Sequence, residues 1–159
     1  MARAAVIAVI GAGDAPPEVL ELALETGREI AARGATLVCG GRGGVMEAAA
    51  RGAHERGGRT IGILPGYDKD SANRFIEFAV ATGMGEARNV IVVASADAVI
   101  ALSGEGGTLA EIGFALKLGR PLVALRSWPQ LDGLYRADNA AAAVATALEL
   151  AGRAQGGLR

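Results

Sequence analysis

The chain has 159 residues, of which 51% are hydrophobic and 4% aromatic, with a formal net charge of −1 at pH 7. This length suits one domain with a substantial core, and the balanced charge excludes the basic footprint of a nucleic-acid-binding protein. One cysteine, Cys39, and one histidine, His54, exclude an intrachain disulfide and offer no set of metal ligands. No apolar run approaches the roughly 20 residues of a membrane helix, so we expect a cytoplasmic protein without a membrane partner.

Short apolar runs alternate with helix-length segments, which is the pattern of βα units on a parallel sheet. The runs predict six strands, at residues 4–10, 35–39, 60–64, 75–80, 98–102 and 121–125. We place one domain over residues 1–151. The glycine-rich tail, residues 152–159, is predicted to be disordered.

The first predicted helix has well-marked ends. Asp14 is expected to be its N-cap, Pro16 and Pro17 open it, and Gly34 follows its end. Its buried face is predicted from helical spacing to consist of Val19, Ala23, Gly27 and Ile30.

Three more helices are predicted, at about residues 45–56, 108–118 and 138–151. The helix at 108–118 has a predicted buried stripe of Leu109, Ile112, Gly113 and Leu116. The segment 87–96 contains a run of β-branched residues and fits either a strand or a short buried helix.

Two glycine-rich loops follow the first two predicted strands, where ligands bind in open parallel sheets. The first contains Gly11 and Gly13 and begins like a dinucleotide fingerprint, but Pro16 stands where the third glycine would be. The second contains Gly40, Gly41, Gly43 and Gly44, which allow a ligand to approach the backbone closely. Arg42 in this loop is either an anion clamp or a solvated arginine.

The most informative stretch is residues 103–111, Ser-Gly-Glu-Gly-Gly-Thr-Leu-Ala-Glu. A strand, a glycine-rich turn and a helix start bring free backbone N–H groups and the positive helix end to one place, which predicts a phosphate site. Thr108 can add a hydroxyl and Glu111 a carboxylate. Alternatively, the two residues form a capping box, in which Glu111 only satisfies a backbone N–H.

Four motifs occur in order: Gly-Gly-x-Gly-Gly-Val-Met-Glu-Ala-Ala at 40–49, Gly-Arg-Thr-Ile-Gly-Ile-Leu-Pro at 58–65, Arg88-Asn89, and the stretch 104–111. Together they resemble the LOG superfamily, and more closely its short branch that includes molybdenum cofactor carrier proteins. The resemblance implies a Rossmann-like α/β fold, a doubly wound parallel sheet of about six strands with helices on both faces. It also implies a helix at 87–96 and a homodimer.

In LOG enzymes an arginine in Met-His-x-Arg-Lys and a glutamate in Pro-Gly-Gly-x-Gly-Thr-x-x-Glu cleave the N-glycosidic bond of nucleoside 5′-monophosphates. The resemblance carries these catalytic roles to Arg88 and Glu111. Asn89 replaces the lysine, Gly85 and Glu86 replace Met-His, Ser103 replaces the proline, and Glu105 replaces the second glycine.

Two functions follow from the resemblance. The first is a carrier or sensor that binds a nucleotide or a pterin such as the molybdenum cofactor and requires no other cofactor. The alternative is a phosphoribohydrolase with Arg88 and Glu111 as catalytic residues; a lysine decarboxylase is excluded by the absence of a pyridoxal-like lysine setting. The predicted ligand-binding residues are Gly11, Gly13, Gly40, Gly41, Gly43, Gly44, Arg88, Asn89, Gly104, Gly106, Gly107 and Thr108.

Overall fold

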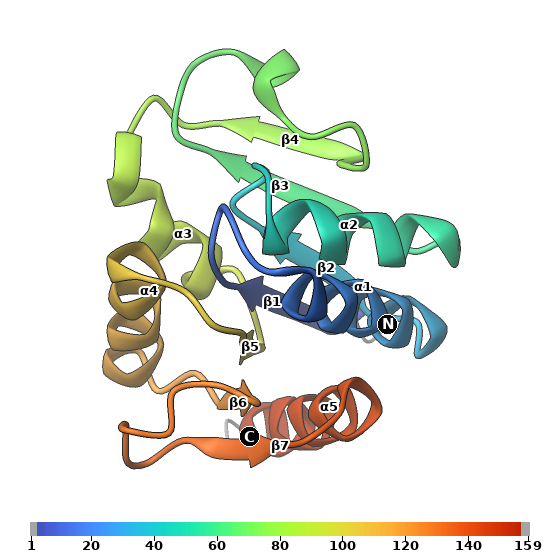
Figure 1. Ribbon diagram of the computed structural model, residues 1–159, viewed down its shortest axis with the longest axis vertical. Helices are drawn as coiled ribbons and strands as arrows, with labels where there is room; N and C mark the ends of the chain where they lie inside the picture. The colour runs from blue at the N-terminus through green and yellow to red at the C-terminus, as the bar shows by residue number, and fades with distance from the viewer. Residues whose placement is uncertain (1–2, 157–159) are drawn as a thin grey trace.

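A computed structural model describes residues 3–156 of the chain. Its strands are β1 (Val6–Ile10), β2 (Thr36–Cys39), β3 (Thr60–Leu64), β4 (Phe78–Ala81), β5 (Ala98–Ala101), β6 (Leu122–Leu125) and β7 (Tyr135–Ala137). The helices are α1 (Pro17–Ala32), α2 (Val45–Glu55), α3 (Asn89–Ala94), α4 (Gly106–Lys117) and α5 (Ala140–Gly156). Two 3₁₀ turns, η1 (Lys69–Ser71) and η2 (Gly85–Arg88), complete the described elements (Figure 1).

The sheet has the strand order β4-β3-β2-β1-β5-β6-β7, and each of these pairings is parallel. From β1 the chain winds to one edge through β2, β3 and β4, then returns to the other side of β1 as β5. The direction of winding therefore reverses between β1 and β5, which is the position where open α/β sheets bind their ligands.

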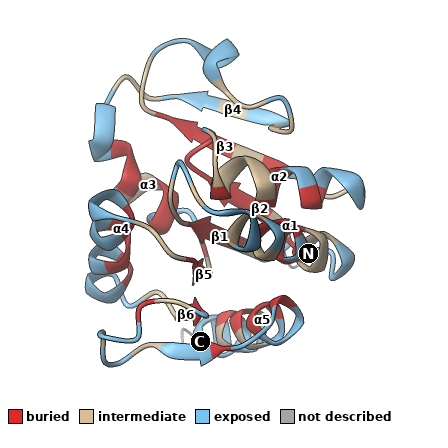
Figure 2. Cartoon of the chain, viewed as in Figure 1, coloured by how far each residue is buried: buried red, intermediate tan, exposed pale blue. Residues whose placement is uncertain are grey.

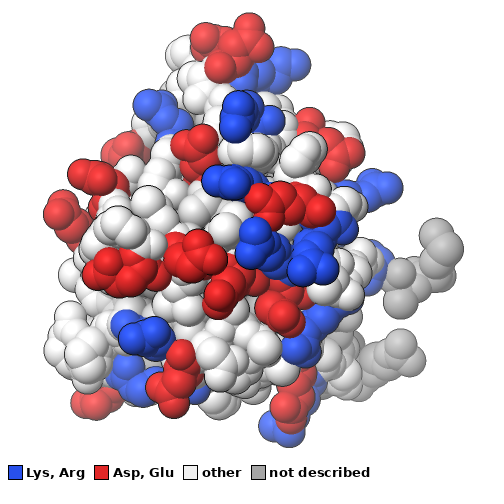
Figure 3. All heavy atoms as spheres, turned by 45° about the vertical axis from the view of Figure 1, so that its right-hand side comes forward, with Lys and Arg blue, Asp and Glu red and all other residues white. Residues whose placement is uncertain are grey.

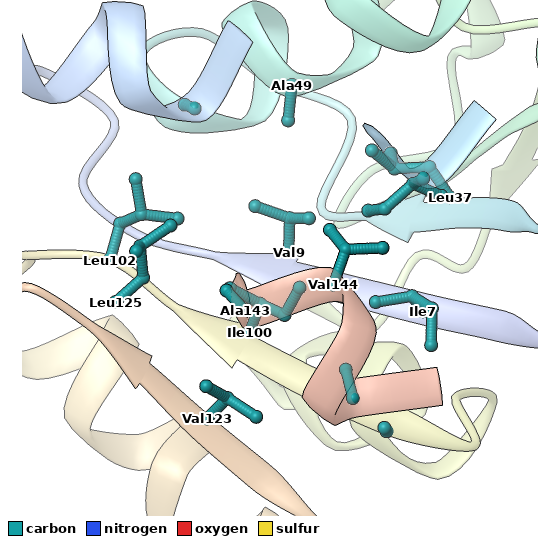
Figure 4. Packing of buried hydrophobic residues seen from close by; sticks show 14 of the residues in the cluster. Ile7, Val9, Leu37, Ala49, Ile100, Leu102, Val123, Leu125, Ala143 and Val144 are labelled. Atoms are coloured by element: carbon teal, nitrogen blue, oxygen red, sulfur yellow. The ribbon is translucent and has the colours of Figure 1, made fainter. Parts of the chain in front are cut away.

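Successive residues of β1 point to opposite faces of the sheet. Ile7 and Val9 join a core with α1, α2 and α5, whereas Ala8 and Ile10 join a second core with α3 and α4. Figure 4 shows the first core, where Val144 and Ala49 pack over the strand residues, and Figure 2 shows buried residues throughout the central strands. A parallel sheet covered on both faces explains why the strands read as continuous apolar runs.

The α/β fold, the winding and the helical layers on both faces confirm the predicted fold class, with one strand more than expected. The added strand is β7, which is short and has Tyr135 and Arg136 exposed, so no apolar run marks it. The ambiguous segment 87–96 contains the helix α3. Within the described part of the chain, none of the helices is long and apolar enough to cross a membrane.

Three predicted helix features are wrong. The N-cap of α1 is Pro16 in extended conformation, which leaves Asp14 outside the helix. In α4 only Ile112 of the predicted stripe is buried, and the other buried residues of this helix are Thr108, Glu111 and Ala115. Helix α5 continues through Gly156, so residues 152–156 are helical, and residues 157–159 of the predicted disordered tail lie outside the described residues.

Candidate functional site

A pocket of about 550 Å³ opens at the carboxyl ends of the central strands, where β1 and β5 meet. Its walls come from the end of β1, from the loops after β1, β2 and β5, from the segment after β3, from η2 and α3, and from the first turns of α2 and α4. The lining residues are Val9, Ile10, Gly11, Ala12, Gly13, Asp14, Gly40, Arg42, Gly43, Met46, Pro65, Glu86, Arg88, Asn89, Glu105, Gly107, Thr108 and Glu111. This volume lies in the range of small-molecule and cofactor sites.

Hydrogen bonds tie the three strand-end loops together at Ala12. The Ala12 N–H donates to the Ser103 carbonyl at 3.0 Å, and the Val45 N–H donates to the Ala12 carbonyl at 2.9 Å. Gly44 has φ +64, and a Cβ there would lie 2.4 Å from the Ala12 oxygen. The loops can therefore approach this closely only because a glycine stands at this contact.

The pocket-facing end of α4 begins at Gly106, after Glu105 at the N-cap position. The N–H groups of the first helical turn have no acceptor within the helix, and the positive end of the helix dipole lies at the same place. Gly107 and Thr108 line the pocket, so this end of the helix faces it. Because Thr108 is the third helical residue rather than the cap, the capping-box alternative is wrong.

Arg88 lies at the end of η2, and its side chain is only 8% exposed. One terminal nitrogen, Nη1, donates to the Asn89 side-chain oxygen and lies 3.9 Å from a Glu86 carboxylate oxygen. The Nε has no hydrogen-bond partner within residues 3–156. A buried guanidinium with an unused donor in a pocket wall is suited to an anionic ligand, because leaving the donor unpaired costs free energy.

Gly40 makes room for this arginine. A Cβ at Gly40 would lie 2.8 Å from the Met46 sulfur and 3.0 Å from the Arg88 Nη2. Both side chains line the pocket, so the glycine lets the floor of the site close against the end of β2.

Glu111 is buried on α4 and also lines the pocket. Burial raises the pKa of Glu111 to about 8; the Arg88 charge opposes this rise and the Glu86 charge adds to it. The carboxyl is therefore mostly protonated at neutral pH in the ligand-free site. Burial outweighs the attraction of the Arg88 guanidinium, which lies 3.9 Å from the Glu86 carboxylate.

Cys39, at the end of β2, is fully buried beneath this floor. Burial raises the pKa of its thiol to about 12, and the Gly41 N–H approaches the sulfur at 3.4 Å. A thiol with this pKa is inert as a nucleophile at neutral pH. The residue is a small apolar component of the core.

The structure brings most of the predicted site residues into one pocket: Gly11, Gly13, Gly40, Gly43, Arg88, Asn89, Gly107, Thr108 and Glu111. Gly41, Gly44, Gly104 and Gly106 are not among the lining residues. Gly41 and Gly44 have positive φ, and a Cβ at Gly104 would lie 2.1 Å from the Thr108 hydroxyl oxygen. These three glycines shape the loops behind the surface of the pocket.

Sequence reasoning assigned no ligand-facing role to Glu86. Asp14 was expected to cap the first helix; it lines the pocket from the loop before α1, because the N-cap is Pro16 and the helix begins at Pro17. Glu86 follows Gly85, whose φ of +59 turns the chain into η2. The replacement of Met-His by Gly-Glu before Arg88 was the one sequence signal for an unusual residue at this position.

The chain is a Rossmann-like α/β protein with a pocket at its topological switch point. Residues 4–151 match the sequence model of the SLOG cluster4 family. The chain belongs to this family and thus to a branch of the LOG superfamily, as the four sequence motifs predict.

Two relatives illustrate the sequence range of the family. A protein from Archaeoglobus fulgidus without a described function is 45% identical over 128 residues, which are 80% of this chain and 84% of that protein. The cytokinin riboside 5′-monophosphate phosphoribohydrolase of Mycobacterium tuberculosis is 38% identical over 127 residues, which are 74% of this chain and 67% of that enzyme.

The similar solved structures include molybdenum cofactor proteins. The molybdenum cofactor binding protein of Rippkaea orientalis has a TM-score of 0.88 and 34% identity, over 93% of this chain and 98% of that one. The molybdenum cofactor carrier protein of Chlamydomonas reinhardtii has a TM-score of 0.83 and 35% identity, with the same coverage.

The single-stranded-DNA-binding DNA processing protein A of Helicobacter pylori is a more distant match. It has a TM-score of 0.73 and 22% identity, over 91% of this chain and 80% of that one. At this identity the likeness shows the fold alone, and the absence of a nucleic-acid partner stays a prediction.

Proposed function

We propose that the pocket binds a small molecule that carries a phosphate, either a nucleotide or a pterin of the molybdenum cofactor type, and that the protein is a carrier or sensor of this ligand. The observation that carries the proposal is the unpaired Nε of buried Arg88 in the same pocket as the N-terminus of α4. A phosphate oxygen can accept from the guanidinium and from first-turn N–H groups together.

The glycine-rich loops after β1 and β2 provide the remaining wall, against which the ring of the ligand would lie. The similarity to the molybdenum cofactor proteins of Rippkaea orientalis and Chlamydomonas reinhardtii supports the proposal, since the matched region includes nearly the whole of each.

A specific observation favours a second candidate, a nucleoside 5′-monophosphate phosphoribohydrolase: Arg88 and Glu111 line the same pocket. The similarity to the mycobacterial cytokinin riboside 5′-monophosphate phosphoribohydrolase supports this candidate. In this reaction the bond from ribose C1′ to the base nitrogen breaks, the base takes a proton, and water adds to C1′. A protonated Glu111 can supply the proton and, once ionised, can stabilise the developing positive charge on the ribose.

One experiment separates the two candidates. Purified protein is incubated with a panel of nucleoside 5′-monophosphates, and released base is measured by chromatography beside the variants Glu111→Gln and Glu25→Gln. Glu25 is exposed on α1 and is a control for loss of a carboxylate. Base release that Glu111→Gln abolishes and Glu25→Gln retains would support the hydrolase. Absence of release together with binding of a nucleotide or pterin would support the carrier or sensor.

We further propose that two copies of the chain associate through α4 to form a homodimer. Leu109 and Leu116 lie seven residues apart on one side of α4 and are 47% and 50% exposed. Exposed large apolar side chains gathered on one helix are typical of a surface that a partner covers, and a second copy is the commonest partner. Sedimentation equilibrium of the purified chain tests this association.

A further inference from the structure

Charged side chains divide the pocket into a floor and a rim. On the floor, Arg88 and Glu111 are buried. On the rim, four charged lining residues are exposed: Asp14, Arg42, Glu86 and Glu105. Three of these four carry a carboxyl group, so the rim is acidic although the floor offers a cation. Figure 3 shows acidic and basic side chains interspersed over the face of the molecule that it draws.

The rim carboxyls come from three separate segments. Asp14 lies in the loop between β1 and α1, Glu105 precedes the first residue of α4, and Glu86 lies in η2. Glu86 is 83% exposed, and its carboxylate lies 3.9 Å from the Arg88 Nη1. The three carboxyl groups are therefore more exposed to solvent than the buried Arg88 guanidinium, to which a phosphate would bind.

Such an arrangement is unfavourable for a ligand that is anionic along its whole length. A further negative group of the ligand at the rim would be repelled by three carboxylates and attracted by one guanidinium, that of Arg42. A group that donates hydrogen bonds or carries positive charge would instead find acceptors there.

We propose that the pocket selects dipolar ligands, with a phosphate at the floor and a cationic or donor-rich group, such as an amine or amino-substituted ring, at the acidic rim. Glu105 and Glu86 are the specificity-determining residues. This proposal rests on the proposed binding of a phosphate and adds the chemistry of the other end of the ligand.

Two matched series of probes test the proposal: ω-aminoalkyl phosphates with chains of two, four and six carbons, and alkyl phosphates of the same chain lengths. The chain lengths vary the reach from the floor to the rim. Binding is followed by ¹⁵N–¹H correlation spectra, in which the amides of Gly107 and Thr108, two lining residues of the first turn of α4, report phosphate binding.

We expect the aminoalkyl phosphate to bind more tightly than its alkyl counterpart at the chain lengths that reach the rim. Glu105→Gln should reduce this preference by about threefold, the effect of one exposed ion pair. Glu86→Gln should reduce it similarly and should also tighten both series, because Arg88 loses a competing carboxylate. Glu25→Gln, on the exposed face of α1, should leave the preference unchanged.

Equal affinities of the two series at every chain length would overturn the inference while phosphate binding stands. An amine preference that neither rim variant reduces would overturn the assignment to Glu105 and Glu86. Failure of both series to shift the Gly107 and Thr108 amide signals, in the wild type and in Arg88→Met alike, would overturn the proposed phosphate site, and the inference with it.

Discussion

The two helical layers pack against the sheet in different ways. In the first, α1 and α2 touch backbone to backbone: a Cβ on Gly27 would lie 1.9 Å from the Ala49 carbonyl oxygen, and one on Gly52 would lie 2.0 Å from the Leu24 carbonyl oxygen. In the second, α4 turns Leu109 and Leu116 outward and buries Thr108 and Glu111. The first layer completes its packing within the chain, whereas the second uses its inner face for the pocket and leaves its leucines uncovered.

The close contact of the first layer predicts the largest effect. Gly52→Val should lower the free energy of unfolding by about 3 kcal/mol or more, because the new side chain would overlap the backbone of α1. Urea denaturation followed by circular dichroism measures the change.

The matched control is Gly113→Ala in α4, where a Cβ would have no neighbour within 4 Å. Its unfolding free energy should rise by about 0.5–1 kcal/mol, because alanine favours the helix. If Gly113→Ala lowers the unfolding free energy as much as Gly52→Val does, then α4 is packed as closely as α1 and α2, and the proposed difference between the two helical layers is wrong.

The second prediction concerns the carboxyl that α4 buries. Because the folded-state pKa of Glu111 is raised from 4.5 to about 8, the native state holds a proton that the unfolded state releases in this range. Stability is thus highest below pH 4.5 with respect to this group and falls as the pH rises toward 8, by up to about 1.4 kcal/mol per pH unit. Glu111→Gln should flatten this dependence in denaturation experiments from pH 5 to 8.5, and Glu25→Gln should retain it. An unchanged slope in Glu111→Gln would show that Glu111 is ionised in the folded protein.

The third prediction concerns the uncovered leucines. Leu116→Glu should weaken self-association by more than about tenfold, since a charge at a buried apolar contact is unfavourable. The monomer should keep its unfolding free energy within about 0.5 kcal/mol, as for other exposed positions. Sedimentation equilibrium measures the association, with Lys117→Glu as the control for an added acidic group on the same helix. If both variants self-associate as tightly as the wild type, the dimer contact lies elsewhere on the molecule.

The smallest effect on stability is expected at Trp128, in the loop between β6 and β7, which packs against the second helical layer. The Trp128 indole N–H donates to the Leu102 carbonyl at 2.8 Å and its ring lies in the core under α3 and α4. Trp128→Phe should lower the unfolding free energy by about 1 kcal/mol, the net value of one hydrogen bond. Tyr135→Phe, at an exposed position, should change nothing measurable in the same denaturation experiment. Equal stabilities of Trp128→Phe and the wild type would show that the hydrogen bond makes no net contribution.

The sequence predicts the first layer better than the second. Apolar runs mark six of the seven strands, and the spacing of Ala23, Gly27 and Ile30 correctly marks the buried face of α1. In α4 the predicted buried face is wrong, because hydrophobic periodicity assigns the leucines to the core. The structure instead buries Thr108 and Glu111, which line the pocket. The local sequence pattern does not reveal that polar residues are buried and leucines exposed in this helix.

The same limit applies to the site. Glycine-rich turns after strands correctly predict which loops form the pocket, since that follows from the topology of any open parallel sheet. The protonation of Glu111 depends instead on desolvation against distant segments, including the one that carries Arg88. Asp14 lies on the rim because Pro16, and not Asp14, is the N-cap of α1. Such properties arise only when tertiary contacts exist.

The pairing of β1 with β5 also governs when the site comes into being during synthesis. Ile7 pairs with Ala98, so the two loops on either side of the switch point become neighbours only after the chain through β5 has emerged and folded. A nascent chain that ends before this point has β1 to β4 and no Thr108 or Glu111. Parallel pairing over such a separation is slow, since a long loop must close first. A ligand that needs both loops therefore stabilises the finished fold and none of its shorter precursors.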